Sequence, residues 1–396
     1  MTDEPEAPRV ASAFALALLV GVFAVLLRPE SAEEPNAPSE DALAAHDRIL
    51  ARRSTDLTFG GSPIALLEDS FLQREVIAEQ IARQLYPGFG KDAVWDKHTV
   101  FAHAPDRNLK LRWPEHPDGG WISATDALGM REDRPAASTP PDLRILVLGD
   151  SHTDGVCAND ETFSNRLEEI LRTARPERSV EVLNGGKGGW CAYNYLGAVE
   201  KWRDLEPDLV IVALYGGNDL VEAPLYRHYF ERTERPAEQR AMAVRVVDVA
   251  TRHPAACSQA VTQTAYLTWT GDVQPAVDTT GRVFEEVART CETIGAELLV
   301  AYLPAPSQVE LDRHRDLLDP ALDALGLTLA DLDVLDAARD TLLDRLASAG
   351  LRTVDLTSAL SSAARDEPQY WRRDLHLGLS GHVTVAAALA EVLAAD

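Results

Sequence analysis

Four polar side chains stand where an acyl-transfer site could form. Ser151 directly follows an apolar run that ends in Gly-Asp, Asn218 follows a second such run, and Asp374 and His376 stand near the end of the chain. Acyl transfer needs a nucleophile, a base that takes its proton, a group that orients the base, and hydrogen-bond donors for the oxyanion. Ser151, His376 and Asp374 can fill the first three roles, and the Asn218 amide is a suitable donor.

A glycine-rich turn at residues 184–189 offers backbone N–H groups. The turn reads Asn-Gly-Gly-Lys-Gly-Gly, and glycine leaves its N–H unshielded because it has no Cβ. Its spacing differs from the phosphate-binding loop that ends in Gly-Lys-Ser/Thr and from the dinucleotide-binding Gly-x-Gly-x-x-Gly pattern. The turn is therefore better suited to an oxyanion than to a phosphate.

Strands and helices alternate from residue 143 to the end of the chain. Apolar runs predict strands at 143–149, 180–184, 208–215, 296–303 and 352–356. Apolar residues at helical spacing predict helices at 161–174, 192–204, 281–294, 309–325, 329–349 and 380–394. This alternation predicts an α/β protein with three layers, in which helices cover both faces of a doubly wound, mostly parallel sheet. The carboxyl ends of such strands share one rim, so the turns that follow them are expected to lie together.

Four short blocks of this sequence resemble those of the SGNH, or GDSL, hydrolases. The blocks are Gly149-Asp150-Ser151, the glycine turn around Gly186, Gly216-Gly217-Asn218-Asp219 and Asp374-x-His376. The resemblance implies a flavodoxin-like α/β/α fold and a serine ester hydrolase that needs no metal or organic cofactor. It implies that Ser151 is the nucleophile, His376 the base and Asp374 the group that orients the base. The implied oxyanion donors are the backbone N–H groups of Ser151 and Gly186 and the side-chain amide of Asn218.

The resemblance extends beyond the four blocks, with one departure. Residues 121–220 and 295–395 resemble the membrane-anchored, exported bacterial branch of the family. The commonest family form places the Asp three residues before the His, whereas Asp374 stands two residues before His376. The implied substrate is a small ester or an acylated glycan, for instance O-acetyl groups on a cell-envelope polysaccharide.

Other interpretations of these residues remain open. Asp374 and His376 could belong to a structural loop or to a metal pair, although no third ligand stands at a suitable spacing. His382 is a second possible base, but its place at the start of the C-terminal helix favours capping or packing. An O-acyltransferase would use the same site with a sugar hydroxyl in place of water, and a non-catalytic envelope-binding protein would keep only the fold.

The composition divides the chain into segments. Residues 10–27 carry no charge and are almost wholly apolar over 18 positions, a length at the lower end for a membrane span. We therefore expect an uncleaved transmembrane anchor with the catalytic domain on the extracytoplasmic side, and a cleaved signal peptide is the alternative. The other predicted segments are a tail at 1–9, a linker at 28–41, a helical and extended segment at 42–142 that packs on the catalytic domain, and a hydrolase domain at 143–396 with an insertion at 221–280.

The charge of the chain excludes one class of partner. The net charge is −25 at pH 7 and the pI is near 4.8, while 45% hydrophobic and 26% charged residues are typical of a globular protein. A nucleic-acid-binding protein needs a basic face, so no nucleic-acid partner is expected.

Four cysteines leave the redox state open. They are Cys157, Cys191, Cys257 and Cys291. Cys157 and Cys191 both fall in turns at the predicted rim, so a disulfide between them is possible in an exported protein. Two thiols are an equally acceptable interpretation.

Overall fold

A five-stranded parallel sheet forms the centre of the protein. The computed structural model describes residues 93–221, 223, 237–271 and 273–394. The strands are β5 (Leu143–Gly149), β6 (Val180–Asn184), β7 (Leu209–Tyr215), β8 (Glu297–Leu303) and β9 (Arg352–Asp355). They lie in the order β6-β5-β7-β8-β9, and every neighbouring pair is parallel. This is the flavodoxin-like order, and the predicted strands are confirmed to within one residue at each end.

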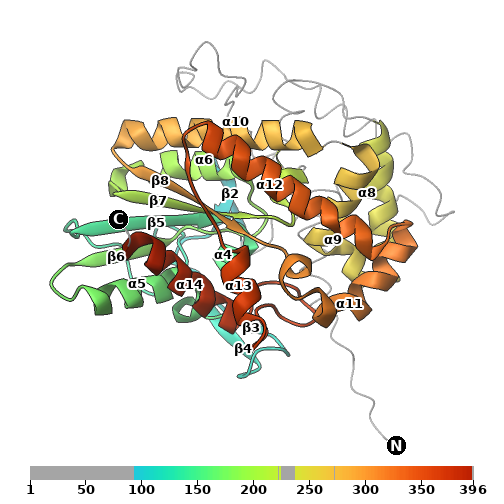
Figure 1. Cartoon of the computed structure of the whole chain (residues 1–396). Coiled ribbons are helices and arrows are strands. Elements are labelled where there is room, and N and C mark those ends of the chain that lie inside the picture. The colour runs from blue at the N-terminus through green and yellow to red at the C-terminus, as the bar shows by residue number, and fades with distance from the viewer. Residues whose placement is uncertain (1–92, 222, 224–236, 272, 395–396) are drawn as a thin grey trace, which may run out of the picture.

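Helices cover both faces of the sheet. Figure 1 shows α6 (Ala192–Lys201), α10 (Val273–Ile294) and α12 (Asp333–Ser348) on one face and α5 (Phe163–Ala174), α13 (Thr357–Ala363) and α14 (Leu379–Ala394) on the other. All seven residues of β7 are buried, as are all but the first of β5. Apolar residues fill these strands because neither face meets water. The predicted α/β fold, a parallel sheet between helices, is confirmed.

The strand order reverses at β5. β6 pairs with one edge of β5 and β7 with the other, and Gly149 at the end of β5 lies opposite Ala213 of β7. The two strands are followed by connections to helices on opposite faces, which opens a crevice outside their carboxyl ends. Ligand sites of such sheets form in this crevice.

Further helices lie beyond the carboxyl ends of the strands. They are α8 (Ala237–Ala250), α9 (Gln259–Thr270) and α11 (Pro306–Leu325), which pack together in Figure 1. α8 and α9 belong to the stretch 221–280 that interrupts the predicted alternation. The next helix, α10, begins at Val273 rather than at the predicted residue 281, because the buried residues Ala276 and Val277 extend its packed face. Short 3-10 turns occur at Asn159–Glu161 (η3), Arg203–Leu205 (η4), Pro254–Cys257 (η5) and Leu329–Leu332 (η6).

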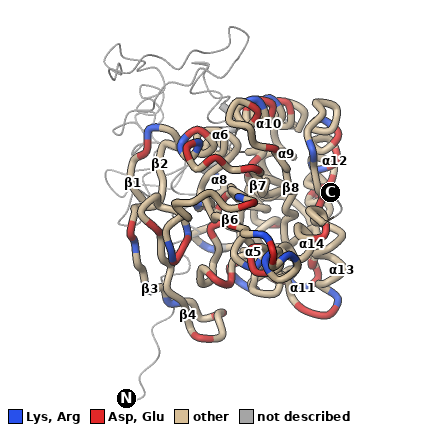
Figure 2. Tube along the Cα trace, turned by 90° about the vertical axis from the view of Figure 1, so that its left-hand side faces the viewer, with Lys and Arg blue, Asp and Glu red and all other residues tan. Residues whose placement is uncertain are grey.

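Two β-hairpins precede the sheet in the chain. They pair β1 (Ala93–Asp96) with β2 (Val100–His103), and β3 (Asn108–Arg112) with β4 (Gly120–Ala124). Figure 2 shows both hairpins on the side of the molecule away from α12, and acidic residues distributed over many elements. The Trp190 indole N–H donates to the Phe101 carbonyl at 2.8 Å and so ties the first hairpin to the body of the protein.

The elements predicted before the hairpins precede the part of the chain that the structure describes. The transmembrane segment at 10–27 and the helical stretches within 42–92 lie outside the described residues. Within the part of the chain that the structure describes, no helix is long and apolar enough to cross a membrane.

The possible disulfide between Cys157 and Cys191 is not formed. Both residues are fully buried thiols. Cys157 leads into α5, whereas Cys191 caps the start of α6. These helices cover opposite faces of the sheet. The disulfide hypothesis is therefore wrong for this structure.

Candidate active site

Ser151, His376 and Asp374 form a continuous chain of hydrogen bonds. Ser151 Oγ lies 2.8 Å from His376 Nε2, and His376 Nδ1 lies 2.7 Å from Asp374 Oδ1. A carboxylate that accepts a hydrogen bond from Nδ1–H keeps the imidazole proton on Nδ1, so Nε2 carries no proton and can accept the hydrogen bond of the serine hydroxyl. Ser151 is 6% exposed and His376 is 8% exposed, so both side chains are largely shielded from bulk water but remain accessible to a small molecule. This arrangement can activate the hydroxyl for attack on a carbonyl carbon.

Ser151 lies at a sharp connection between β5 and a short helix. The sequence predicts a turn here, and the structure shows Ser151 as the first residue of α4 (Ser151–Asp154). The Asp150 carboxylate accepts the His152 N–H at 2.9 Å and caps this helix. A Cβ at Gly149 would collide with the Thr153 side chain. Glycine at this position thus permits the close connection that places the hydroxyl at the rim.

A strained loop brings Asp374 and His376 together despite their short spacing. Leu375, between them, has a φ of 69°, a left-handed conformation that few non-glycine residues adopt. The Trp371 N–H donates to the His376 carbonyl at 2.9 Å, and the Leu375 N–H donates to the Trp371 carbonyl at 3.2 Å. This closed loop turns both side chains toward each other, so an Asp two residues before the His can reach its Nδ1.

Glu115, in the turn between β3 and β4, holds this loop in place through hydrogen bonds to its backbone. Its carboxylate accepts the backbone N–H of Arg373 at 3.0 Å and that of Asp374 at 3.1 Å. The sequence gives no signal for this contact, because Glu115 and Asp374 are 259 positions apart. The second hairpin is therefore part of the support of the site.

The electrostatics of His376 predict the pH dependence of activity. Burial lowers the pKa of His376, but the charge and hydrogen bond of Asp374 outweigh burial, and the pKa is raised above the ordinary value of 6.5. A protonated imidazole cannot take the serine proton, so activity is lost as the pH falls through this raised pKa. We expect the acidic limb of kcat/KM, measured with a chromogenic ester, to have its midpoint above pH 6.5. A midpoint at or below 6.5 would contradict this account of His376.

A hydrogen bond to Asp150 holds the Asn218 side chain beside the nucleophile. Its Nδ2 donates to Asp150 Oδ2 at 3.2 Å, and Asp150 precedes Ser151 in the chain. Burial raises the pKa of Asp150 to about 6. Because a carboxamide nitrogen carries two hydrogens, this bond fixes the Asn218 amide and leaves its second N–H for a substrate oxygen.

In the glycine turn, Gly188 lies beside Ser151, whereas the sequence predicts that Gly186 does. The Gly186 N–H donates to Asn184 Oδ1 at 3.0 Å, and the predicted donor role of Gly186 would require this bond to open. A Cβ at Gly188 would lie 3.5 Å from Ser151 Cβ, which places Gly188 directly beside the nucleophile. The Gly188 N–H donates to Asp154 Oδ2 at 3.0 Å.

A buried carboxyl group supports the start of this turn. Glu132 Oε1 accepts the Asn184 N–H at 2.7 Å, and burial raises the pKa of Glu132 to about 8. An unfolded glutamic acid ionises near 4.5, so between these two values only the folded protein keeps the proton. Stability contributed by the protonated group is therefore present at low pH and is lost as the pH rises toward 8.

Replacing this carboxyl with an amide tests the burial of Glu132. Glu132→Gln keeps the acceptor oxygen and removes the ionisation. We expect the variant to gain roughly 5 °C in melting temperature over the parent at pH 8, with a much smaller gain at pH 5. The measurement is thermal unfolding of both proteins at the two pH values. An equal difference at both values would show that Glu132 ionises normally.

Asp154, three residues after Ser151, joins the front segment to the site. Arg131 Nη1 donates to Asp154 Oδ1 at 2.8 Å, and His103 Nε2 lies 2.9 Å from Asp154 Oδ2. Burial lowers the pKa of His103 to about 3. Sequence reasoning missed His103, because β2 contains no motif.

His152 and Gln259 are two further residues at Ser151 that sequence reasoning missed. His152 stacks on the Tyr215 ring with a centroid separation of 3.8 Å, and Gln259 Nε2 lies 3.3 Å from Ser151 Oγ. His152 could have been noticed, since it follows Ser151 in the chain. Gln259 lies in a stretch with no recognisable block, 108 positions away.

His382, the other possible base, lies against Phe163 rather than beside Ser151. Its Nδ1 accepts the Phe163 N–H at 3.1 Å, and its ring stacks on that of Phe163. The residue is fully buried, and burial lowers its pKa to about 3. His382 therefore packs in the interior, as the sequence predicts. No group of three or more His, Cys, Asp or Glu suited to a metal ion occurs among the residues that the structure describes.

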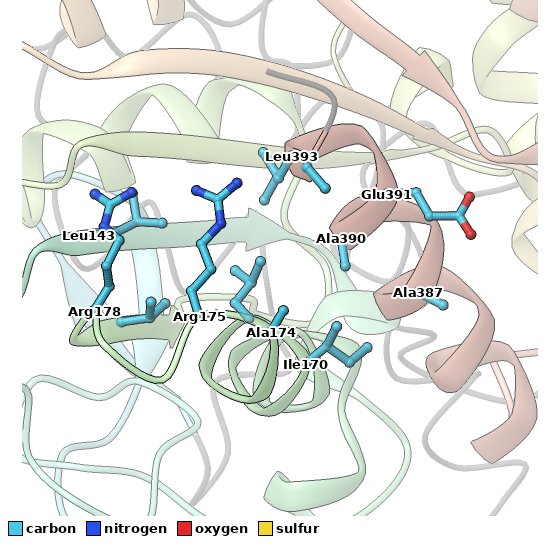
Figure 3. Close-up of a pocket in the computed structure, with 12 residues that line it drawn as sticks. Leu143, Ile170, Ala174, Arg175, Arg178, Ala387, Ala390, Glu391 and Leu393 are labelled. Carbon is cyan, nitrogen blue, oxygen red and sulfur yellow. The ribbon is translucent and has the colours of Figure 1, made fainter.

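The pocket in Figure 3 lies at the other end of the sheet. Leu143 and Val180, the first residues of β5 and β6, line it together with apolar side chains of α5 and α14, and with Arg175 and Arg178. Ser151 follows the carboxyl end of β5. The pocket is therefore separate from the candidate active site.

Two family models match the chain. Residues 147–327 match the GDSL-like lipase/acylhydrolase family. Residues 264–396 match the SGNH hydrolase-like domain of the acetyltransferase AlgX. The two matches overlap and together cover the sheet from within β5 to the C-terminus. No curated protein matches the sequence.

Several solved structures resemble parts of this chain weakly. A catalytic mutant of Axe2, an acetylxylan esterase from Geobacillus stearothermophilus, is 15% identical over 64% of this chain and 95% of its own, with a TM-score of 0.39. A two-domain esterase (CEX) active on acetylated mannans is 15% identical over 64% of this chain and 49% of its own, with a TM-score of 0.35. The acetyl xylan esterase AlAXEase is 13% identical over 63% of this chain and 100% of its own, with a TM-score of 0.37.

Proposed function

Because residues 147–396 carry a hydrolase domain of the GDSL, or SGNH, family, which acts on ester bonds, we propose that Ser151 is its nucleophile. His376 is the base and Asp374 orients it. Two hydrogen bonds support this assignment: one of 2.8 Å between Ser151 and His376, which are 225 positions apart, and one of 2.7 Å between His376 and Asp374. The Asp374 carboxylate also stabilises the positive imidazolium that forms during attack.

The proposed reaction proceeds through an acyl-enzyme. The Ser151 oxygen forms a bond to the ester carbonyl carbon while its proton passes to His376 Nε2. The carbonyl electron pair moves onto the oxygen, which receives hydrogen bonds from the Ser151 N–H and the Asn218 amide, and from the Gly186 N–H if it leaves Asn184. The imidazolium then protonates the departing alcohol. Water, deprotonated by His376, releases the acid and restores Ser151.

We further propose that the acyl group is acetyl and that the substrate is an acylated glycan of the cell envelope. The family of the C-terminal match is named for an acetyltransferase, which supports a short acyl group. The apolar, uncharged segment 10–27 supports a membrane anchor with the catalytic domain on the extracytoplasmic side. Such a placement brings the rim of the sheet to envelope polysaccharides.

An O-acyltransferase is the second candidate, favoured by the same family name. The two functions differ only in whether water or a sugar hydroxyl attacks the acyl-enzyme. The test is incubation of the full-length chain with p-nitrophenyl acetate, with and without an oligosaccharide acceptor. A hydrolase releases one acetate for each p-nitrophenol under both conditions. A transferase places acetyl groups on the acceptor, detected by mass spectrometry, and an envelope-binding protein turns over no ester beyond the rate of Ser151→Ala.

A further inference from the structure

One amide side chain from the interrupting stretch lies against the reacting hydroxyl. Gln259 is the first residue of α9, and its Nε2 lies 3.3 Å from Ser151 Oγ. Its Oε1 lies 3.3 Å from His152 Nε2. A single carboxamide thus bridges the nucleophile and the residue that follows it in the chain.

His152 determines which way this carboxamide faces. The Leu377 N–H donates to His152 Nδ1 at 3.2 Å, so the proton of a neutral ring is on Nε2. Burial and the neighbouring His376 hold the pKa of His152 well below its usual range, which keeps the ring neutral. The Nε2–H then donates to Gln259 Oε1. The amide NH₂ must therefore face Ser151.

The ring that orients Gln259 is itself held firmly. His152 is 1% exposed and stacks on Tyr215 with an interplanar angle of 28°. The ring cannot rotate without breaking the bond to Leu377 and the stack. The orientation of the Gln259 amide is consequently fixed before any substrate arrives, and a donor fixed in advance stabilises a developing charge most effectively.

Three other amide groups of the rim already donate one hydrogen to an acceptor within the protein. The Gly186 N–H donates to Asn184, the Gly188 N–H donates to Asp154, and one hydrogen of the Asn218 amide goes to Asp150. Gln259 differs from these donors because its bond is made to the reacting oxygen itself. When that oxygen becomes bonded to the acyl carbon, the oxyanion is attached to the same carbon and lies close to the same N–H.

We propose that Gln259 is a further catalytic residue, whose amide, oriented by His152, donates a hydrogen bond to the oxyanion formed on attack by Ser151. The inference rests on the proposed serine mechanism. As the Ser151 oxygen bonds to carbon and its proton moves to His376, the carbonyl π pair becomes the oxyanion charge. The Gln259 N–H moves from the serine oxygen to that charge, and it returns when the carbonyl reforms. His152 acts through Gln259 as a positioning residue.

Two substitutions at Gln259 distinguish the hydrogen bond that its amide donates from the packing of its side chain. Gln259→Leu removes the amide, whereas Gln259→Glu keeps the shape but replaces the donor with an acceptor. Both are made in the full-length chain and assayed with p-nitrophenyl acetate. We expect each to lower kcat roughly 10- to 100-fold with little change in KM, because a donor used only in the transition state affects kcat. The matched control is Gln274→Leu, at an exposed position of α10, which should retain the parent rate.

The outcomes distinguish this inference from the proposed function. Losses of kcat in both variants, with unchanged melting temperatures, support the oxyanion role of Gln259. Rates within twofold of the parent, or a rise in KM at unchanged kcat, overturn it while the parent stays active. If the leucine variant does not fold, the isosteric Gln259→Glu decides by the same criteria. A parent that hydrolyses no ester and is not labelled at Ser151 by a fluorophosphonate refutes the proposed serine mechanism, and the role of Gln259 with it.

Discussion

Replacing Ser151 with alanine is expected to reduce kcat for ester hydrolysis by roughly 10⁴- to 10⁶-fold. The hydroxyl supplies the atom that carries the acyl group, and no neighbouring side chain can take its place. His152 is held between Tyr215 and Leu377, and Gln259 offers an amide rather than a nucleophile. The measurement is the steady-state rate with p-nitrophenyl acetate, corrected for the uncatalysed reaction.

The control for this substitution is another buried serine. Ser164 lies in α5, fully buried, with its hydroxyl 3.5 Å from Thr162 Oγ1 and no contact with His376. Ser164→Ala should leave kcat within about twofold of the parent, since it touches none of the reacting groups. If Ser151→Ala keeps more than a tenth of the parent rate, Ser151 is not the nucleophile.

Asp374→Asn is expected to lower kcat by roughly 10³- to 10⁴-fold. The asparagine can turn its amide N–H toward His376 Nδ1, which moves the imidazole proton to Nε2. His376 then offers a proton to Ser151 and cannot accept one. The loss of the carboxylate charge should also move the acidic limb of kcat/KM to lower pH than in the parent, because Asp374 raises the pKa of His376.

An exposed aspartate just before the loop provides the comparison. Asp366→Asn changes the same functional group on the surface and should leave both kcat and the pH profile unchanged. If Asp374→Asn has the parent rate and the acidic limb of its kcat/KM profile is unchanged, Asp374 does not act with His376 and Ser151 as a catalytic triad. The strained conformation at Leu375 would then have no catalytic purpose.

The sheet could be predicted closely because its strands obey one simple constraint. β5 and β7 are covered on both faces, so they are apolar runs that end at glycine, and such runs are visible in the sequence. The place of Ser151 and Asn218 at the rim follows from the same constraint. His376 could be found because it forms a recognisable pair with Asp374, and the structure brings both to Ser151.

The residues that hold the catalytic side chains in place could not be predicted, because most of them reach the site through contacts between segments far apart in the sequence. Glu115 and Gln259 lie in stretches without a motif, and each reaches the site only through the fold. The Gly186 N–H is bonded to Asn184, a local contact that a pattern of glycines does not reveal. For Cys157 and Cys191 the sequence left a disulfide and two thiols equally open, and the structure shows two free thiols.

The central claim is that the Ser151 hydroxyl is activated by His376, and active-site labelling tests it most directly. The full-length chain is treated with a fluorophosphonate and digested, and the labelled peptide is sequenced by mass spectrometry. The account predicts one label per chain, located on Ser151, absent from Ser151→Ala and formed far more slowly in His376→Ala. A label on another residue, or equal labelling of the parent and Ser151→Ala, would contradict it.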